Sequence, residues 1–142
     1  IPNLTAVENV ELPLIYRGVS RSVRQELSRE ALKKVGLEHR MDHKPSEMSG
    51  GQQQRVAIAR AIAQAPPVIL ADEPTGNLDS NSTKEIMDIL KGLHNEGRTV
   101  ILITHDNDIA AQAKRVIKIK DGKVESDSGQ IVPVEELQTA GA

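Results

Sequence analysis

Two adjacent carboxylates stand directly after a short apolar run in the middle of the chain. Residues 68–71 read Val-Ile-Leu-Ala, and Asp72 and Glu73 follow them. The run is typical of a buried strand, and open α/β sheets bind ligands at the carboxyl ends of their strands. A first carboxylate there can hold Mg²⁺, usually through water, and a second can orient or deprotonate an attacking water. Alone, the pair could equally cap the strand and begin a turn at Pro74.

A serine and two glycines precede a helical pattern. Ser49, Gly50, Gly51 and Gln52 follow one another directly. Backbone N–H groups at a helix N-terminus form an anion site, glycines let a phosphate approach closely, and the serine hydroxyl adds a donor. Taken alone, the pattern is more typical of a serine-capped helix than of a phosphate site.

A histidine follows the next apolar strand pattern, residues 99–104. At the carboxyl end of that strand, His105 could reach the same cleft as Asp72 and Glu73 and contact a phosphate or a water. A lone histidine in a loop seldom does either. The set gives the interpretation its weight, because all these features occur in order at short spacings and can face one cleft.

The elements that must hold these residues alternate along the second half of the chain. The patterns predict a helix over 52–64, a strand over 68–71, a helix opened by a capping box at Ser82 and Glu85, a strand over 99–104, a short helix around 108–113, a hairpin turning at Asp121-Gly122 and a last helical turn at 133–138. Two buried strands separated by helices predict a mainly parallel α/β sheet.

The first 45 residues read as helical. A capping box at Thr5 and Glu8 opens a first helix, in which Pro13 predicts a kink or an end. A second helix is predicted over 22–35, and Gly36 is a natural stop. The expected apolar face of this helix consists of Val23, Leu27, Ala31, Leu32 and Val35. The chain therefore begins with a helical part and continues into the alternating part.

Composition bounds the class of protein. The chain has 142 residues and a formal net charge of −2, which suits one compact domain and argues against a dedicated nucleic-acid binder. No run approaches the roughly 20 apolar residues of a membrane-spanning helix. The absence of cysteine excludes a disulfide scaffold. His39 and His43 have the spacing of a metal pair, but their polar segment lacks further ligands, so we assign no metal there.

The motifs together resemble the nucleotide-binding subunit of ATP-binding-cassette (ABC) transporters. Residues 48–52 are similar to the family's signature motif, with Met48 in place of the usual leucine. Residues 68–72 resemble its Walker B strand, residues 76–79 resemble its D-loop, and His105 resembles its switch histidine. Glu73 then stands where the family has its catalytic glutamate.

Two longer stretches narrow the resemblance. Residues 4–14 and 71–79 look like the branch that includes lipoprotein-release and macrolide-export ATPases, the LolD and MacB type. The cell-division ATPase FtsE shares much of this pattern and stays an alternative.

The resemblance implies a partial P-loop NTPase fold of the ABC ATPase type. Residues 1–48 would form the helical signature subdomain, continuing into the signature helix 49–65, and residues 66–142 the C-terminal part of the RecA-like ATPase core. The implied partners are a second nucleotide-binding domain in a head-to-tail dimer and a transmembrane permease, with no nucleic acid. The implied location is cytoplasmic, against the inner face of the cell membrane.

The resemblance also implies a function for each motif residue. The ligands would be ATP and Mg²⁺. The implied assignments are Ser49 and Gly51 on the γ-phosphate of an ATP held by the partner subunit, Gly50 and Gln52 in the same loop, Asp72 on Mg²⁺ through water, Glu73 on the attacking water, His105 on the γ-phosphate, and Asp79 across the dimer interface.

One element of the family pattern is absent from the 142 residues. A P-loop needs Gly-x-x-x-x-Gly-Lys-Ser/Thr, but the only Gly-Lys pair is Gly122-Lys123, which Val124 follows, and Ile117 stands where the first glycine should be. The family's Q-loop glutamine would lie upstream of Ile1. We therefore expect a C-terminal portion of a longer ATPase that is inactive alone and self-associates through surfaces that missing strands would cover.

Two other classes compete with a transport ATPase. A DNA-repair or chromosome-type ABC ATPase would explain the missing P-loop, but it requires a long coiled coil, and residues 1–44 show short capped helices instead. A non-enzymatic module that kept the fold would show decay of the catalytic set. Here Asp72, Glu73 and His105 are all present, which favours an enzyme.

Overall fold

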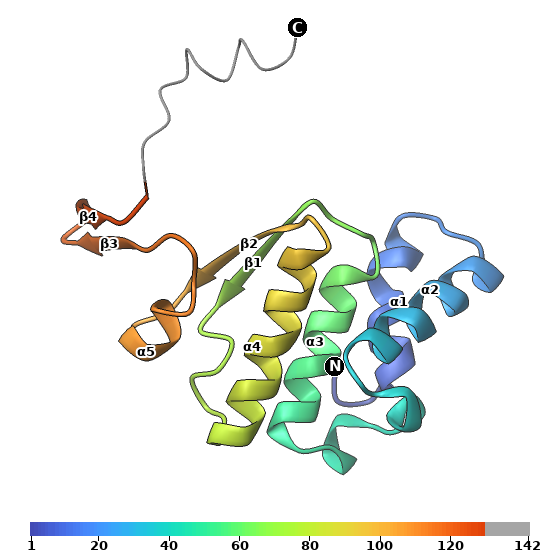
Figure 1. The fold of residues 1–142 in the computed structure, drawn as a ribbon. Helices are drawn as coiled ribbons and strands as arrows, with labels where there is room; N and C mark the ends of the chain where they lie inside the picture. The colour runs from blue at the N-terminus through green and yellow to red at the C-terminus, as the bar shows by residue number, and fades with distance from the viewer. Residues whose placement is uncertain (130–142) are drawn as a thin grey trace, which may run out of the picture. The chain divides into compact units, whose positions relative to one another are not determined.

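The structure is a computed structural model that describes residues 1–129, and it divides into two compact units, Ile1–Ile103 and Thr104–Ala142 (Figure 1). In chain order the elements are α1 (Ala6–Tyr16), α2 (Arg21–Lys34), the 3-10 turns η1 (Glu38–Arg40) and η2 (Pro45–Glu47), α3 (Gly50–Ile62), β1 (Val68–Asp72), α4 (Ser80–Asn95), β2 (Thr99–Ile103), α5 (Asn107–Ala110), β3 (Ile117–Lys120) and β4 (Lys123–Asp127). The turn expected at 133–138 lies outside the described residues.

Helix α1 begins at the expected capping box. The Glu8 N–H donates to Thr5 Oγ1 (3.3 Å), and the Thr5 N–H donates to Glu8 Oε2 (2.8 Å). The expectation that Pro13 could end the helix is wrong, because α1 continues to Tyr16. Leu14 is buried immediately after the proline, so packing holds the last turn although Pro13 has no N–H to donate.

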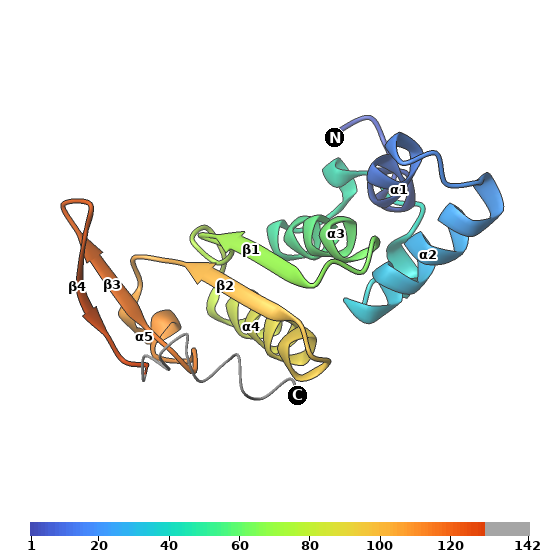
Figure 2. The ribbon, with the colours of Figure 1, turned by 90° about the horizontal axis from the view of Figure 1, so that it is seen from above.

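Helices α1, α2 and α3 form a cluster around a shared apolar core (Figure 2). Its fully buried side chains include Val10, Leu14, Leu32, Val35, Leu37 and Ala59. An ion pair between Arg24 Nε and Glu11 Oε2 (2.9 Å) joins α1 to α2. The apolar face expected for residues 22–35 is wrong at Val23, which is exposed, because the cluster covers only the part of α2 that contains Ala31 and Leu32.

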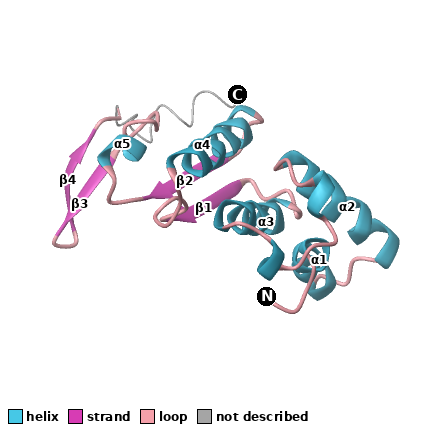
Figure 3. Cartoon of the chain, turned by 90° about the horizontal axis from the view of Figure 1, so that it is seen from below, coloured by secondary structure: helices cyan, strands magenta, loops and turns pink. Residues whose placement is uncertain are grey.

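Strands β1 and β2 pair in parallel, from Val68 opposite Thr99 to Asp72 opposite Ile103. The prediction of two parallel strands is confirmed, but the prediction that they are buried is wrong. Helix α4 packs along β2 on one side (Figure 3), where Ile69 is buried. Among residues 1–129 the side chains on the other side of the strands are exposed, Leu70 to 71%, and we call this side the open face. Its exposed apolar side chains are Val68, Leu70, Ile101 and Ile103.

In the second unit, β3 and β4 form the expected antiparallel hairpin. Asp121 and Gly122 both have left-handed backbone, with φ of 51° and 73°. Two such residues give the type I′ turn that matches the twist of a hairpin. None of the helices within residues 1–129 is long and apolar enough to cross a membrane.

Candidate functional site

The first turn of α3 is built on Ser49. Its hydroxyl oxygen accepts from the Gln52 N–H (3.2 Å), and Gln52 Oε1 accepts from the Ser49 N–H (3.0 Å). This capping box confirms the expected serine cap, and the hydroxyl still has a hydrogen to donate. The N–H groups of Gly50 and Gly51 precede the first intrahelical bonds. With Ser49 and Gly50 exposed, the turn presents donors of the kind that bind an anion.

Gly51 is a glycine for a reason that the sequence did not reveal. A Cβ at this position would lie 2.6 Å from Ser82 Oγ and 2.8 Å from Ser82 Cβ, so α4 occupies the space that any side chain would need. At Gly50 a Cβ would meet only Leu78 Cδ2, at an ordinary 3.6 Å. Of the two glycines, Gly51 is the one that helix packing requires, whatever binds at the exposed turn.

Helix α4 begins earlier than predicted. Asp79 is its cap: Oδ1 accepts from the N–H groups of Asn81 and Ser82 (3.0 Å each), and Oδ2 accepts from Ser82 Oγ (2.8 Å). The capping box expected at Ser82 and Glu85 is wrong, because the aspartate upstream caps the helix first and Glu85 pairs with Arg55 Nη1 (3.1 Å). The bonds from the Ser82 N–H and then its hydroxyl lower the pKa of Asp79.

Asp72 and Glu73 lie at the carboxyl end of β1, as predicted. Asp72 is exposed, and Glu73 follows it with φ at +44°, a left-handed backbone that non-glycine residues rarely adopt. Two hydrogen bonds hold this turn, from the Glu73 N–H to the Ile103 carbonyl (2.9 Å) and from the Gly76 N–H to the Glu73 carbonyl (3.3 Å). Strained backbone of this kind is common at functional sites.

His105 belongs to the second unit, where it precedes the short helix α5. Asp106 caps that helix, and its own N–H donates to Thr104 Oγ1 (3.1 Å). The meeting of His105 with Asp72 and Glu73 in one cleft stays a prediction.

The structure does bring together the two segments expected at the dimer interface. Residues 49–52 and residues 76–79 adjoin at Gly50 and Leu78. Beside this contact, Gly51 packs against Ser82 in the first turn of α4, the helix that follows residues 76–79. Sequence reasoning took Ser82 for a helix cap and missed its packing against Gly51 and its bonds to Asp79. The available signal was the run Asp79-Ser80-Asn81-Ser82, in which an aspartate is as good a helix cap as a serine.

The carboxylate at the end of β1 fits a magnesium ion only as an outer-sphere ligand, which binds through water. Within residues 1–129 no group of three or more histidine, aspartate or glutamate side chains could hold a metal ion. Asp72 is a single exposed carboxylate at the end of a strand. Such a group suits a Mg²⁺ that keeps its waters and takes its other ligands from phosphates.

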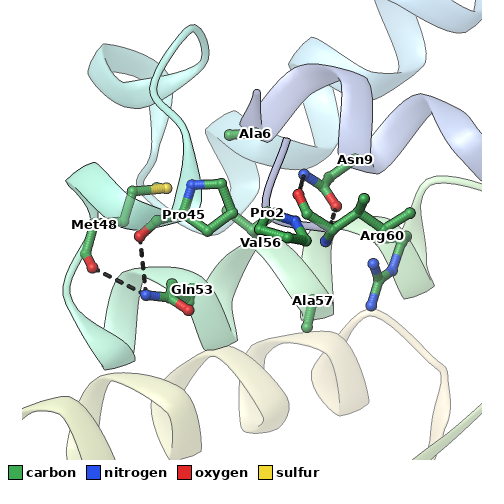
Figure 4. Close-up of a pocket in the computed structure, with 10 residues that line it drawn as sticks. Pro2, Ala6, Asn9, Pro45, Met48, Gln53, Val56, Ala57 and Arg60 are labelled. Atoms are coloured by element: carbon green, nitrogen blue, oxygen red, sulfur yellow. Dashed lines mark hydrogen bonds between the residues drawn. The ribbon is translucent and has the colours of Figure 1, made fainter. Parts of the chain in front are cut away.

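A pocket of about 240 Å³ lies between α1, η2 and α3 (Figure 4). Its wall includes Gln53, whose Nε2 donates to the carbonyls of Pro45 (3.0 Å) and Met48 (3.1 Å). The side chains around it are Ile1, Pro2, Ala6, Asn9, Pro45, Met48, Gln53, Val56, Ala57 and Arg60. None of the predicted site residues lines this pocket.

Comparison with known proteins identifies the family. Residues 1–76 match the model of the family described as ABC transporter. The fold agrees with a solved structure entitled "Dimeric Structure of MJ0796, a Bacterial ABC Transporter Cassette", at a TM-score of 0.77 and 50% identity over 90% of this chain and 57% of that one. The chain therefore belongs to the ABC transporter family, and its structure is part of the ABC ATPase fold.

Named relatives narrow the branch. The chain is 56% identical over 130 residues to the macrolide export ATP-binding/permease protein MacB 2 of Aeromonas hydrophila, and 54% identical over 129 residues to MacB of Pasteurella multocida. These alignments cover 92% and 91% of this chain. The chain spans only 20% of the length of each of these relatives.

Proposed function

We propose that this chain forms the signature-bearing part of an ATP-hydrolysing cassette that powers an export-type membrane permease. The observation that carries the proposal is the exposed first turn of α3, where Ser49 and the N–H groups of Gly50 and Gly51 provide donors beside the loop of residues 76–79. In a member of the ABC transporter family, these donors suit the γ-phosphate of an ATP that a second cassette holds. Gln52 keeps the loop in shape through its bond with Ser49.

The carboxyl end of β1 provides the chemistry. Asp72 would hold Mg²⁺ through water, and a bound Mg²⁺ would neutralise charge on the phosphates. Glu73 orients or deprotonates the attacking water, and the short turn to Gly76 fixes its backbone. His105 contacts the γ-phosphate. We place Asp79 at the interface between the cassettes, where it shapes the surface as the cap of α4.

The proposed function requires two partners. A second nucleotide-binding domain faces this one head to tail, and the solved structure that the chain resembles is described as dimeric. A transmembrane permease takes up the energy, and the curated relatives are named ATP-binding/permease proteins. We assign residues 1–65 to the helical signature subdomain and residues 66–142 to the ATPase core, with the cassette in the cytoplasm against the inner face of the cell membrane.

The proposed ATPase requires a P-loop, and the 142 residues do not contain that motif. Because a P-loop supplies most phosphate contacts, the 142 residues alone should neither bind MgATP tightly nor hydrolyse it. Calorimetry with MgATP and a phosphate-release assay on the purified chain check both statements. Robust turnover by the chain, abolished by Glu73→Gln, would contradict this part of the proposal.

The decisive experiment uses the full-length protein that carries these residues together with a P-loop. Glu73→Gln should leave nucleotide binding intact and lower turnover by about 100-fold or more, because a positioned general base contributes at least that factor. Glu26→Gln, an exposed position on α2, is the matched control and should keep wild-type turnover. Wild-type turnover in Glu73→Gln would refute the function assigned to Glu73.

A further inference from the structure

Ser82 contacts both segments that the proposed interface needs. It lies in the first turn of α4, where its hydroxyl donates to Asp79 Oδ2 (2.8 Å) and its N–H donates to Asp79 Oδ1 (3.0 Å). Its Cβ and Oγ fill the space in front of Gly51, where a built Cβ would come within 2.8 Å and 2.6 Å of them. The Ser82 side chain therefore packs against residues 49–52 at the start of α3, which we call the signature turn. The same side chain holds the carboxylate of Asp79, the last residue of the D-loop (residues 76–79).

The two helix N-termini are joined at a second point nearby. Leu78, the residue before Asp79, comes within ordinary van der Waals distance of a Cβ built on Gly50. An ion pair between Arg55 and Glu85 (3.1 Å) ties the same two helices one turn further on. Of these contacts, only Ser82 combines close packing on the signature turn with hydrogen bonds to Asp79.

We propose that Ser82 is a positioning residue that makes the signature turn and the D-loop one rigid surface toward the partner cassette. This inference rests on the proposed function. Ser82 touches neither nucleotide nor water in it. The hydroxyl fixes the Asp79 carboxylate, and the packing on Gly51 sets how far the first turn of α3 stands from the first turn of α4. The distance between Ser49 and the D-loop is then fixed when an ATP held by the partner cassette binds against them.

The alternative is that Ser82 contributes only to the stability of α4. The two possibilities differ in what the loss of the hydroxyl changes. A purely structural contribution lowers the amount of folded, active protein and leaves the KM for ATP unchanged. A positioning contribution changes how well the assembled surface receives ATP, so KM rises in protein that is folded.

The first measurement concerns only the hydroxyl and uses the 142-residue chain. Ser82→Ala removes the hydroxyl and keeps the Cβ, and Ser80→Ala is the matched control on the same turn. Because a bond to the charged carboxylate lowers its pKa, we expect the pKa of Asp79, followed by carboxyl NMR, to rise in Ser82→Ala and to stay unchanged in Ser80→Ala. An unchanged pKa in Ser82→Ala would overturn the proposal whether or not the protein hydrolyses ATP.

The second measurement concerns the surface and uses the full-length protein. Ser82→Ala should raise the KM for MgATP about threefold to tenfold, the size that corresponds to the net loss of one typical intramolecular hydrogen bond, with kcat and the thermal midpoint close to wild type. Ser80→Ala should match wild type in all three. An unchanged KM in Ser82→Ala, with an active wild type, overturns the positioning proposal alone. An inactive wild type refutes the proposed function instead.

Discussion

The helical cluster and the two-stranded sheet bury their apolar residues to very different degrees. In the cluster, Leu14, Leu32 and Leu37 are almost completely buried by α1, α2, α3 and the turns between them. In the sheet, Leu70 and Ile103 remain more than half exposed, because α4 covers one side only. The cluster thus closes its own core, whereas the stability of the sheet depends on one covered face.

This difference in burial means that the two parts of the candidate site rest on supports of different stability. The signature turn at Ser49 stands on the closed cluster, so its shape is determined by residues of this chain. Asp72 and Glu73 stand at the end of a strand that is open on one side. We therefore expect substitutions to have unequal effects in the two regions.

The largest difference should appear between two leucines. Leu32→Ala should lower the free energy of unfolding by about 2–5 kcal/mol, because it leaves a cavity in a closed core. Leu70→Ala, on the open face, should change it by about 0.5 kcal/mol or less. Urea unfolding followed by far-UV circular dichroism suits a chain whose only aromatic residue is Tyr16. Equal losses of unfolding free energy in the two variants would contradict the difference between the closed cluster and the half-exposed sheet.

The open face should also govern self-association of the 142-residue chain. Apolar patches of this kind promote association, and we expect the chain to associate reversibly in light scattering as its concentration rises. Leu70→Lys should weaken association by about tenfold or more, since burying a leucine is worth roughly 1.5–3 kcal/mol.

Val23→Lys is the control for that experiment. It places the same charge at an exposed apolar residue of α2, in the helical cluster, and should leave association unchanged. A wild-type chain that stays a monodisperse monomer at high concentration would contradict the expectation.

A smaller effect tests the contact between α3 and α4. Gly51→Ala should cost about 1–3 kcal/mol of stability, because its Cβ would overlap Ser82. The double variant Gly51→Ala with Ser82→Gly should lose less than the sum of its single changes. Gly92→Ala, in α4 with open space around it, should instead stabilise by about 0.5–1 kcal/mol. Thermal unfolding of the four variants gives the answer, and additive losses would argue against the contact.

The smallest effect concerns the hairpin, which an exposed ion pair supports. The Arg115 guanidinium, and then the Gly129 N–H, lower the pKa of Asp127 to about 2. This pair contributes stability above the unfolded pKa of about 3.9, and the contribution is lost as pH falls toward 2. In Arg115→Gln the NMR-measured pKa of Asp127 should rise toward its ordinary value. A pKa still near 2 would show that the ion pair is not the cause.

Local signals in the sequence predicted the local structure well. The caps at Thr5 and Ser49 and the turn at Asp121-Gly122 are confirmed, because each depends on side chains within a few residues of one another. The motif order along the chain likewise indicated the ABC transporter family, which the comparisons show. The caps of α1 and α3, the hairpin turn and the family could thus be predicted from local patterns, whereas the start of α4 was placed too late.

What the sequence could not predict depends on contacts between distant segments. The crowding of Gly51 by Ser82 arises only when α3 and α4 pack. The exposure of Leu70 and Ile103 follows from which face of the sheet α4 covers, and an apolar run reads the same in either case. The cap at Asp79 was predictable in principle, but the pattern at Ser82 and Glu85 offered a competing start.

At Glu73, which has a left-handed backbone, thermal stability and ATP hydrolysis favour different residues. A glycine would adopt φ of +44° with less strain, so selection for thermal tolerance alone would favour Glu73→Gly. Under the proposed mechanism the same change removes the group that acts on water. Directed evolution of such a cassette toward heat resistance should therefore lose hydrolysis first at this turn, unless turnover is selected in parallel.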